Sequence, residues 1–335
     1  MTNKRHNAGI LGTGYYVPEK RITNRDIEKM VDTNDAWIVE RTGIRERRAA
    51  EPGTPVSEIA CKAAEMAIED AGVRAEDLDL IIFATLTPDY YIPSTACVLQ
   101  MRLGAAKAAA FDLEAACSGF VYASAIAAQF IENGIYKHIL VVGAEVLSNM
   151  VDWEDRNTCI LFGDGAGAAV YGAVPEGEGI LAFDLGADGT GGDTLIVPAG
   201  GSAQPTTEES IKARQHFMQM DGKAVFRFAV KVMGKTVLDA LEKIGMDKSE
   251  IDHLIPHQAN IRIVQAAAKR LDMPMDKVFV NLDKYGNTSA ASIPIAIAEA
   301  QREHRFKKGD VIALAGFGAG LTWASCILRW TKEDK

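Results

Sequence analysis

The chain has 335 residues, of which 48% are hydrophobic and 24% charged, and its formal net charge is −9. This length and apolar content allow a large buried core, either in two domains or in one duplicated domain. The negative charge argues against general nucleic-acid binding, although a local basic patch is still allowed. Five cysteines match neither a disulfide framework nor a zinc site, the first residues do not resemble a signal peptide, and no apolar stretch is long enough to cross a membrane, so we expect a cytoplasmic protein.

Helix-like and strand-like patterns alternate along the chain. Residues 56–72 have the periodicity of an amphipathic helix, and the apolar runs at 138–144 and 159–173 are typical of buried strands. A second helical pattern covers 224–245, and a third strand-like run covers 311–317. This alternation predicts an α/β fold. Between these elements, PAGGSAQPTTEES at 198–210 is rich in turn-forming residues and predicts a surface loop, either simply solvated or at the rim of a site.

The two halves of the sequence resemble one another. AEDLDLIIFAT matches KSEIDHLIPHQ, with Asp79 opposite Asp252 at an offset of 173 residues (252 − 79). HILVVGAEV matches DVIALAGFG, with Val142 opposite Leu314 at an offset of 172 (314 − 142). Nearly equal offsets in two separate segments indicate an internal duplication, which would divide the chain into residues 1–176 and 177–335. The alternative is that buried strands of any α/β protein look alike.

Cys117 is the best candidate for a nucleophile. It follows a short apolar strand and precedes an amphipathic helix that runs from about Ser118 to Glu132. A helix N-terminus favours the thiolate, which is the reactive form of cysteine. Small neighbouring residues would let a substrate carbonyl approach the backbone amides. The alternative role, a small core side chain, is the one we expect for the other cysteines, Cys61, Cys97, Cys159 and Cys326.

His257 and Asn287 are the best candidates for its partners. His257 ends an apolar strand where a helix begins, and active sites of α/β proteins gather at such strand ends. Asn287 lies in KYGNTSAAS, which the duplication makes the counterpart of the Cys117 segment; without the duplication, a helix cap is the commoner role for such an Asn. GFGAGLTWAS at 316–325 could supply further backbone donors. The Gly-rich turns lack the last glycine of a dinucleotide-binding motif, which disfavours an oxidoreductase.

The segments AACSGF, PHQANIRI, GNTSAAS and GFGAGLTW occur here in the order typical of β-ketoacyl-acyl carrier protein synthase III, and the chain resembles this thiolase-superfamily family along nearly its whole length. The resemblance implies a thiolase-like fold, with duplicated α/β halves in a layered αβαβα arrangement. It also implies a decarboxylative Claisen condensation of a short acyl-CoA with malonyl-acyl carrier protein, which initiates fatty acid biosynthesis. Acyl-CoA and the acyl carrier protein would be the substrates, with no cofactor or metal, in a homodimer that binds neither nucleic acid nor a membrane.

The resemblance implies roles for individual residues. Cys117 would carry the acyl group, His257 and Asn287 would stabilise the enolate formed from the malonyl group, and the backbone N–H groups of Cys117 and Ala319 would form the oxyanion hole. Contacts with coenzyme A would come from Trp37, Arg41, Arg156, Gly222, Phe226 and Asn260. The acyl pocket would be lined by Leu147, Phe162 and Leu195, and by Ile92 reaching across a dimer interface. The carrier protein, which is acidic, would meet a cationic helix face that includes Gln258, Ala259, Asn260, Ile261, Arg262, Lys269 and Arg270.

Two alternatives stay open at this stage. One is a related condensing enzyme of secondary metabolism. The other is a thioester hydrolase with a Cys-His-Asn arrangement, in which His257 would activate Cys117 and Asn287 would orient the imidazole. The sequence does not determine the acyl-CoA primer, because acetyl and branched primers differ by few methylene groups, and the insertion at 198–216 lies close to pocket residues.

Overall fold

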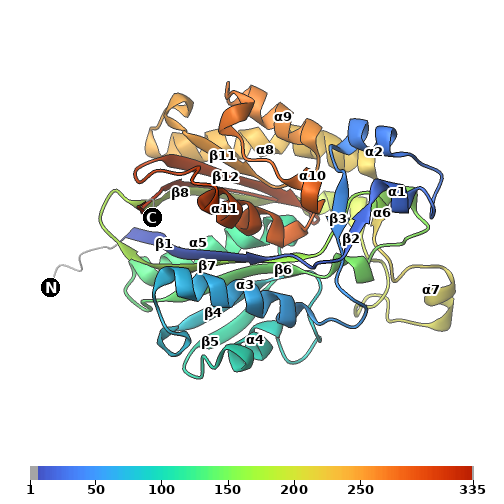
Figure 1. The fold of residues 1–335 in the computed structure, drawn as a ribbon, viewed down its shortest axis with the longest axis horizontal. Coiled ribbons are helices and arrows are strands. Elements are labelled where there is room, and N and C mark those ends of the chain that lie inside the picture. Colours follow the sequence, from blue (N-terminus) through green and yellow to red (C-terminus); the bar gives the residue numbers. More distant parts are fainter. Residues whose placement is uncertain (1–6, 334–335) are drawn as a thin grey trace.

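A computed structural model describes residues 7–333 of the chain. It contains two large β-sheets, separated and flanked by helices (Figure 1). The first sheet has the order β1-β7-β6-β4-β5 and the second the order β11-β12-β13-β8. The strands of the first are β1 (Asn7–Tyr16), β4 (Leu80–Ala84), β5 (Ala109–Leu113), β6 (Ile139–Glu145) and β7 (Gly165–Val174). Those of the second are β8 (Gly179–Ala187), β11 (His253–Pro256), β12 (Val311–Gly318) and β13 (Thr322–Arg329).

The helices form three layers around these sheets. The central layer holds α5 (Gly119–Glu132) and α11 (Ser292–Arg302), which pack between the sheets in one apolar cluster. The outer layers hold α3 (Val56–Ala71) and α4 (Thr95–Leu103) on the first sheet, and α8 (Gly222–Ile244) and α9 (Ile261–Arg270) on the second. Strand residues alternate between layers: Ile82 and Val141 face the central helices, whereas Ile81 and Val142 face α3. The predicted αβαβα arrangement is confirmed.

Shorter elements complete the fold. They include the paired strands β2 (Arg21–Thr23) and β3 (Glu46–Arg48), and β9 (Leu195–Ile196) and β10 (Gln219–Met220). The short helices are α1 (Asn24–Ile27), α2 (Asp35–Thr42), α6 (Arg156–Cys159), α7 (Glu208–Lys212) and α10 (Leu282–Tyr285). Helix α7 lies at the end of the predicted loop at 198–210. No helix in the described range has the length and apolar content that crossing a membrane requires.

Corresponding elements recur with a constant spacing of 173 residues, so Val142 corresponds to Ala315 and the expected pairing with Leu314 was wrong by one residue. Helices α3 and α8 both end at a left-handed glycine, Gly72 and Gly245. The Asp79 carboxylate accepts the backbone N–H of His138, and the Asp252 carboxylate accepts that of Val311 in the same way. The strand order repeats as well. The neighbours β8-β13-β12-β11 in the second sheet correspond one by one to β1-β7-β6-β4 in the first. The duplication is therefore present in the structure. The exact boundary at residue 176, between β7 and β8, stays a prediction.

Two expectations about local structure were wrong. The run at 159–173 is not one strand, because α6 ends at Cys159 and β7 begins at Gly165. Between α6 and β7 the chain turns at Asp164. The buried Asp164 carboxylate accepts the backbone N–H groups of Ala50 and Ser148. Among the cysteines, Cys159 and Cys326 are buried as expected, but Cys97 is exposed and Cys61 is half-buried, because Cys61 only partly packs against the apolar cluster under α3 and α4 and Cys97 lies outside it.

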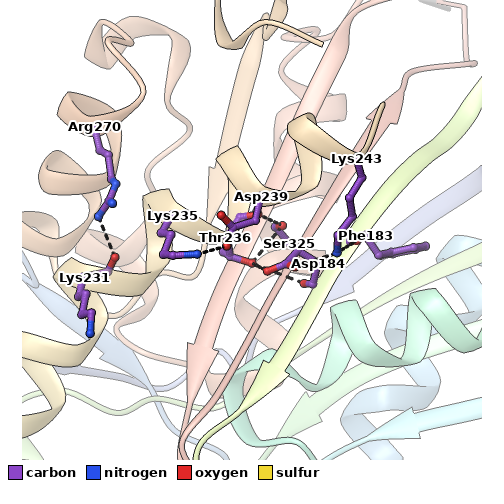
Figure 2. A network of polar contacts seen from close by, with 9 residues as sticks. All are labelled: Phe183, Asp184, Lys231, Lys235, Thr236, Asp239, Lys243, Arg270 and Ser325. Carbon is purple, nitrogen blue, oxygen red and sulfur yellow. Dashed lines mark hydrogen bonds and ion pairs between the residues drawn. The ribbon is translucent and has the colours of Figure 1, made fainter. Parts of the chain in front are cut away.

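Polar contacts, of which the one between Thr236 and Ser325 is buried, fix α8 to the second sheet (Figure 2). The Thr236 hydroxyl donates to Asp184 of β8 at 2.8 Å, and the Ser325 hydroxyl of β13 donates to the Thr236 carbonyl at 2.7 Å. Lys243 adds an ion pair to Asp184 at 2.8 Å. The Arg270 guanidinium of α9 donates to the Lys231 carbonyl of α8 at 2.9 Å. These bonds satisfy polar groups at the interface and join α9 to α8.

Candidate active site

Cys117, His257 and Asn287 line one cavity with an empty volume of about 610 Å³. Cys117 lies in a single turn, Ala116–Ser118, before α5, and Asn287 precedes the equivalent turn, Ser289–Ala291, before α11. His257 directly follows β11, and Ala319, also in the wall, directly follows β12. The starts of both central helices and the ends of two strands therefore meet around one cavity.

The turn that carries Cys117 is packed tightly against the end of β12. A Cβ atom at Gly318 would lie 2.6 Å from the Cys117 nitrogen, so only glycine fits at this position. The Thr322 hydroxyl lies 3.1 Å from the carbonyl oxygens of both Ala115 and Ala319. One side chain thus joins the nucleophile turn to the glycine-rich turn that follows β12. This contact fixes the backbone of Cys117 relative to that of Ala319.

Cys117 is buried, with 5% of the residue exposed. Burial raises the pKa of its thiol to about 12, and the Ser289 hydroxyl opposes this rise. The expectation that the helix start favours the thiolate is therefore not met at rest, because loss of hydration is the larger effect. The resting group is a neutral thiol.

His257 is buried and held in one orientation. Its Nδ1 lies 2.7 Å from the Ser292 hydroxyl oxygen, and its ring packs edge-on against Phe317 with 5.3 Å between ring centroids. Burial lowers the pKa of the imidazole to about 3, so the ring is neutral at physiological pH. Its Nε2 is buried without a hydrogen-bond partner among residues 7–333.

The Asn287 carboxamide is oriented by its own turn. Its Oδ1 accepts the backbone N–H of Ser289 at 2.9 Å, and its backbone bonds to Leu161 and Gly163 on the neighbouring segment. No residue in the described part of the chain accepts a hydrogen bond from Nδ2. With the oxygen engaged, the NH₂ group is the part of the side chain that can serve a ligand.

Glu145 is a buried acid near Cys117 that the sequence analysis missed. It is fully buried at the end of β6 and accepts hydrogen bonds from the Thr87 hydroxyl at 2.7 Å, the Leu86 N–H at 3.0 Å and the Thr85 hydroxyl at 3.1 Å. Burial raises its pKa to about 7, and its charge contributes to the raised pKa of Cys117. The signal in the sequence was an acidic residue closing the apolar run HILVVGAE, a pattern also typical of a solvated strand end.

A second cavity, with an empty volume of about 440 Å³, continues behind Cys117. The two cavities adjoin, because four residues line both of them: Cys117, Phe162, Leu195 and Ala319. Its wall is apolar and contains three residues predicted for an acyl pocket, together with others that were not: Leu147, Phe162, Leu195, Met150, Val197 and Met218. The fourth predicted pocket residue, Ile92, is 88% exposed and lines neither cavity.

Comparisons with known proteins agree with this arrangement. The family model "3-Oxoacyl-[acyl-carrier-protein (ACP)] synthase III" matches residues 111–189, and the model of its C-terminal part matches residues 241–330. A β-ketoacyl-[acyl-carrier-protein] synthase III from Caldanaerobacter subterraneus subsp. tengcongensis is 58% identical over 325 residues, which are 97% of this chain and 98% of that one. The chain belongs to the β-ketoacyl-acyl carrier protein synthase III family.

Two crystal structures of this family have the same fold. The synthase III from Aquifex aeolicus VF5 is 47% identical, with a TM-score of 0.89 over 96% of this chain and 100% of that one. The synthase III from Pseudomonas aeruginosa PAO1 is 43% identical, with a TM-score of 0.90 over 98% of this chain and 99% of that one. The thiolase-like fold expected from the sequence is thereby confirmed.

The residues that the family resemblance assigns to coenzyme A lie in two groups. Gly222, Phe226 and Asn260 line the first cavity. The other three form a cluster outside it, in which the Arg156 and Arg41 guanidinium carbons lie 5.0 Å and 5.8 Å from the centroid of the Trp37 ring. The Asn260 carboxamide donates to the Arg41 carbonyl at 2.9 Å and links the groups. Asn260 also caps α9, so it has a structural role besides any ligand contact.

The residues assigned to carrier-protein binding in this family lie at the start of α9 and along it. Arg262, Lys269 and Arg270 are exposed, whereas Ala259 and Ile261 are half-buried. Gln258 is 1% exposed, and its amide donates to the carbonyls of Pro256 and Phe279. Its prediction as a surface contact is therefore corrected: the side chain is used inside the protein to hold the chain after β11. Among the described residues, no three His, Cys, Asp or Glu side chains gather as a metal site.

Proposed function

We propose that this chain joins the acyl group of a short acyl-CoA to malonyl-acyl carrier protein by decarboxylative Claisen condensation, the first condensation of fatty acid biosynthesis. The observation that carries the proposal is the single cavity lined by Cys117, His257 and Asn287 in a chain of this family. All five cysteines are free thiols, which is consistent with a cytoplasmic location.

In the first step, the Cys117 sulfur attacks the thioester carbonyl carbon of acyl-CoA. The bond from that carbon to the coenzyme A sulfur breaks, and the thiol proton leaves with coenzyme A. The transient oxyanion lies at the N–H groups of Cys117 and Ala319, and the acyl chain enters the apolar cavity behind the sulfur. Since the resting thiol is neutral, the proton is lost as the bond to the acyl carbon forms.

In the second step, the malonyl thioester oxygen accepts hydrogen bonds from His257 Nε2 and Asn287 Nδ2. The bond to the carboxylate breaks, CO₂ leaves, and its electron pair forms an enolate at the thioester. The enolate carbon attacks the acyl carbon on Cys117, the bond to sulfur breaks, and the released thiolate takes a proton from solvent, which is the proton that the overall reaction consumes. Two neutral donors suit this step, because loss of CO₂ creates the carbanion without removal of a proton by a base.

A thioester hydrolase fits the contacts less well. In a Cys-His-Asn hydrolase the Asn side chain holds the imidazole in place. Here Ser292 bonds to His257 Nδ1, while the Asn287 oxygen bonds to the Ser289 backbone. The contacts of Asn287 therefore support a role toward the substrate instead of toward the histidine.

The surface supports the proposed partners. A basic surface on α8 and α9 lies beside the cavity, which residues of both helices line, and its Arg262 is stacked 5.0 Å from the ring centroid of the cavity residue Phe226. Its exposed cations are Lys223, Arg227, Lys231, Arg262, Lys269 and Arg270, on a chain with a net charge of −9. Such a surface would attract an acidic carrier protein. A separate apolar surface, Tyr90, Tyr91, Ile92 and Met101, is exposed and would form the homodimer contact through which Ile92 reaches the partner's pocket.

Labelling with radioactive acyl-CoA tests the proposal. Cys117 should take up the label, and addition of malonyl-acyl carrier protein should release β-ketoacyl product and CO₂. Cys97→Ser, which removes an exposed thiol, is the matched control and should label normally. Label retained in Cys117→Ser, or free acid as the only product, would contradict the proposal. Primers from acetyl-CoA to branched acyl-CoA, tested with the carrier-bound and the CoA-bound malonyl group, would separate this reaction from that of a secondary-metabolism enzyme.

A further inference from the structure

The buried Ser292 hydroxyl is bonded to two neighbours at the end of β11. Its oxygen lies 2.7 Å from His257 Nδ1 and accepts the backbone N–H of Gln258 at 3.1 Å. Ser292 and His257 are 2% and 1% exposed, so water does not compete for these bonds. The backbone N–H of His257 is bonded to the Ala315 carbonyl at 2.7 Å, which holds the main chain at the end of β11 against β12.

Counting protons on these atoms assigns the tautomer of His257. A backbone N–H can only donate, so the Gln258 bond uses a lone pair of the Ser292 oxygen. The hydroxyl has one proton, and within the described chain Nδ1 is its only bonded acceptor. Nδ1 therefore accepts, and the proton of the neutral imidazole lies on Nε2, the nitrogen that has no partner among the described residues.

We propose that Ser292 is a positioning residue that holds His257 as the Nε2–H tautomer and so makes it a hydrogen-bond donor toward the thioester oxygen. The inference rests on the role proposed for His257 in decarboxylation. In the other tautomer, Nε2 would present a lone pair to the developing enolate oxygen and repel it. Ser292 acts through His257 and does not itself touch the substrate.

The duplication supports this assignment independently. The positions 173 residues before His257 and Ser292 are Ala84 and Gly119, and they too are neighbours, since a Cβ at Gly119 would lie 3.1 Å from the Ala84 Cβ. In the first half the strand end and the helix start therefore approach each other in the same way, with only an alanine and a glycine at the two positions. In the second half both members of the pair are polar and bonded to each other. A serine needed only to begin the helix would not require a histidine at the facing position.

Nitrogen NMR of the protein labelled with ¹⁵N-histidine tests the tautomer directly. The His257 signal is identified by its absence in His257→Ala. In the unmodified protein, Nδ1 should have the shift of an unprotonated nitrogen and Nε2 that of a protonated one. The reverse pattern would overturn the proposal, and this measurement does not depend on whether any Ser292 variant folds or on whether the proposed reaction occurs.

Kinetics of Ser292→Ala test the consequence. We expect malonyl decarboxylation to slow by about tenfold to a hundredfold, because the donor is present in only part of the molecules. Acylation of Cys117 by labelled acyl-CoA should change by less than about twofold, since it does not use His257 in this scheme. Ser292→Thr, which keeps the hydroxyl, should restore the tautomer and most of the rate. Equal loss of both steps in Ser292→Ala, or an unchanged decarboxylation rate, would overturn the proposal.

Discussion

The two central helices begin with turns that have the same backbone and different chemistry. Ala116 and Ser289, at equivalent positions, have φ values of 47° and 49°. In each turn the backbone N–H of this residue donates, at 2.9 Å, to a side-chain oxygen of the residue two positions earlier. That residue is Glu114 in the first half and Asn287 in the second. The hydrogen bond that shapes the turn is thus the same in both halves. Only the second half uses a side chain, the Asn287 carboxamide, whose NH₂ group can still donate a hydrogen bond after its oxygen is engaged.

This difference shows how a duplicated scaffold can divide one reaction between its halves. The first half provides the nucleophile, Cys117, where the second has Ala290. The second half provides the donors, His257 and Asn287, where the first has Ala84 and Glu114. Neither half needs a new backbone for its task. The chemistry at each turn is therefore open to test by exchanging side chains between equivalent positions.

The largest effect is expected from Asn287→Asp, which makes the second turn resemble the first. Aspartate can accept the Ser289 N–H, so the turn is kept, but the donor to the thioester oxygen is lost. Malonyl decarboxylation should fall by about 10²- to 10³-fold, as on loss of other oxyanion donors, while acylation of Cys117 is retained. Rates of CO₂ release and of Cys117 labelling measure the two steps. Glu114→Gln, the converse exchange, is the control and should leave both rates within about twofold.

The second test concerns the proton on Cys117. Since burial raises its pKa to about 12, the thiolate fraction and the rate of alkylation by iodoacetamide should rise about tenfold per pH unit from pH 7 to 10, without a plateau near 8.5. Mass spectrometry of the Cys117 peptide in a Cys97→Ser background follows the rate. A plateau below pH 9 would mean that the helix start outweighs desolvation after all.

The smallest effect is expected at Glu145, whose equivalent at the end of β12 is Gly318. The pKa of Glu145 is raised to about 7 in the folded protein, so the folded state binds the proton more tightly than the unfolded state between pH 4.5 and 7. Its contribution to stability is complete below pH 4.5 and is lost as the pH rises through 7, by about 3 kcal/mol. Glu145→Gln should remove this slope, as measured by urea unfolding at several pH values. If the free energy of unfolding depended on pH in the same way in Glu145→Gln, another group would be responsible for the dependence.

The sequence predicted the scaffold better than the electrostatics. Helices α3 and α8 and strands β6 and β12 followed the expected ranges, because their apolar periodicity is strong. The duplication and the meeting of Cys117, His257 and Asn287 also depended on patterns that are visible in the chain. The neutral state of the Cys117 thiol did not, because local neighbours indicate a helix start but not how deeply it is buried.

Three further residues were misjudged or missed for a similar reason. Gln258 follows the catalytic histidine candidate in a polar segment, HQAN, and its burial depends on carbonyls from Pro256 and from Phe279, which is 21 residues away. Ser292 looked like one small residue among several. Glu145 ended an apolar run, as exposed residues often do. Each takes its role from contacts between segments far apart in sequence.

The position of β8 in the second sheet has a consequence for synthesis on the ribosome. In the described sheet its neighbour is β13, which is completed only at Arg329. The nucleophile and its helix therefore leave the ribosome long before the strand order around the cavity can close. The C-terminal half therefore cannot assemble its sheet strand by strand as it is made, because its first strand pairs with its last.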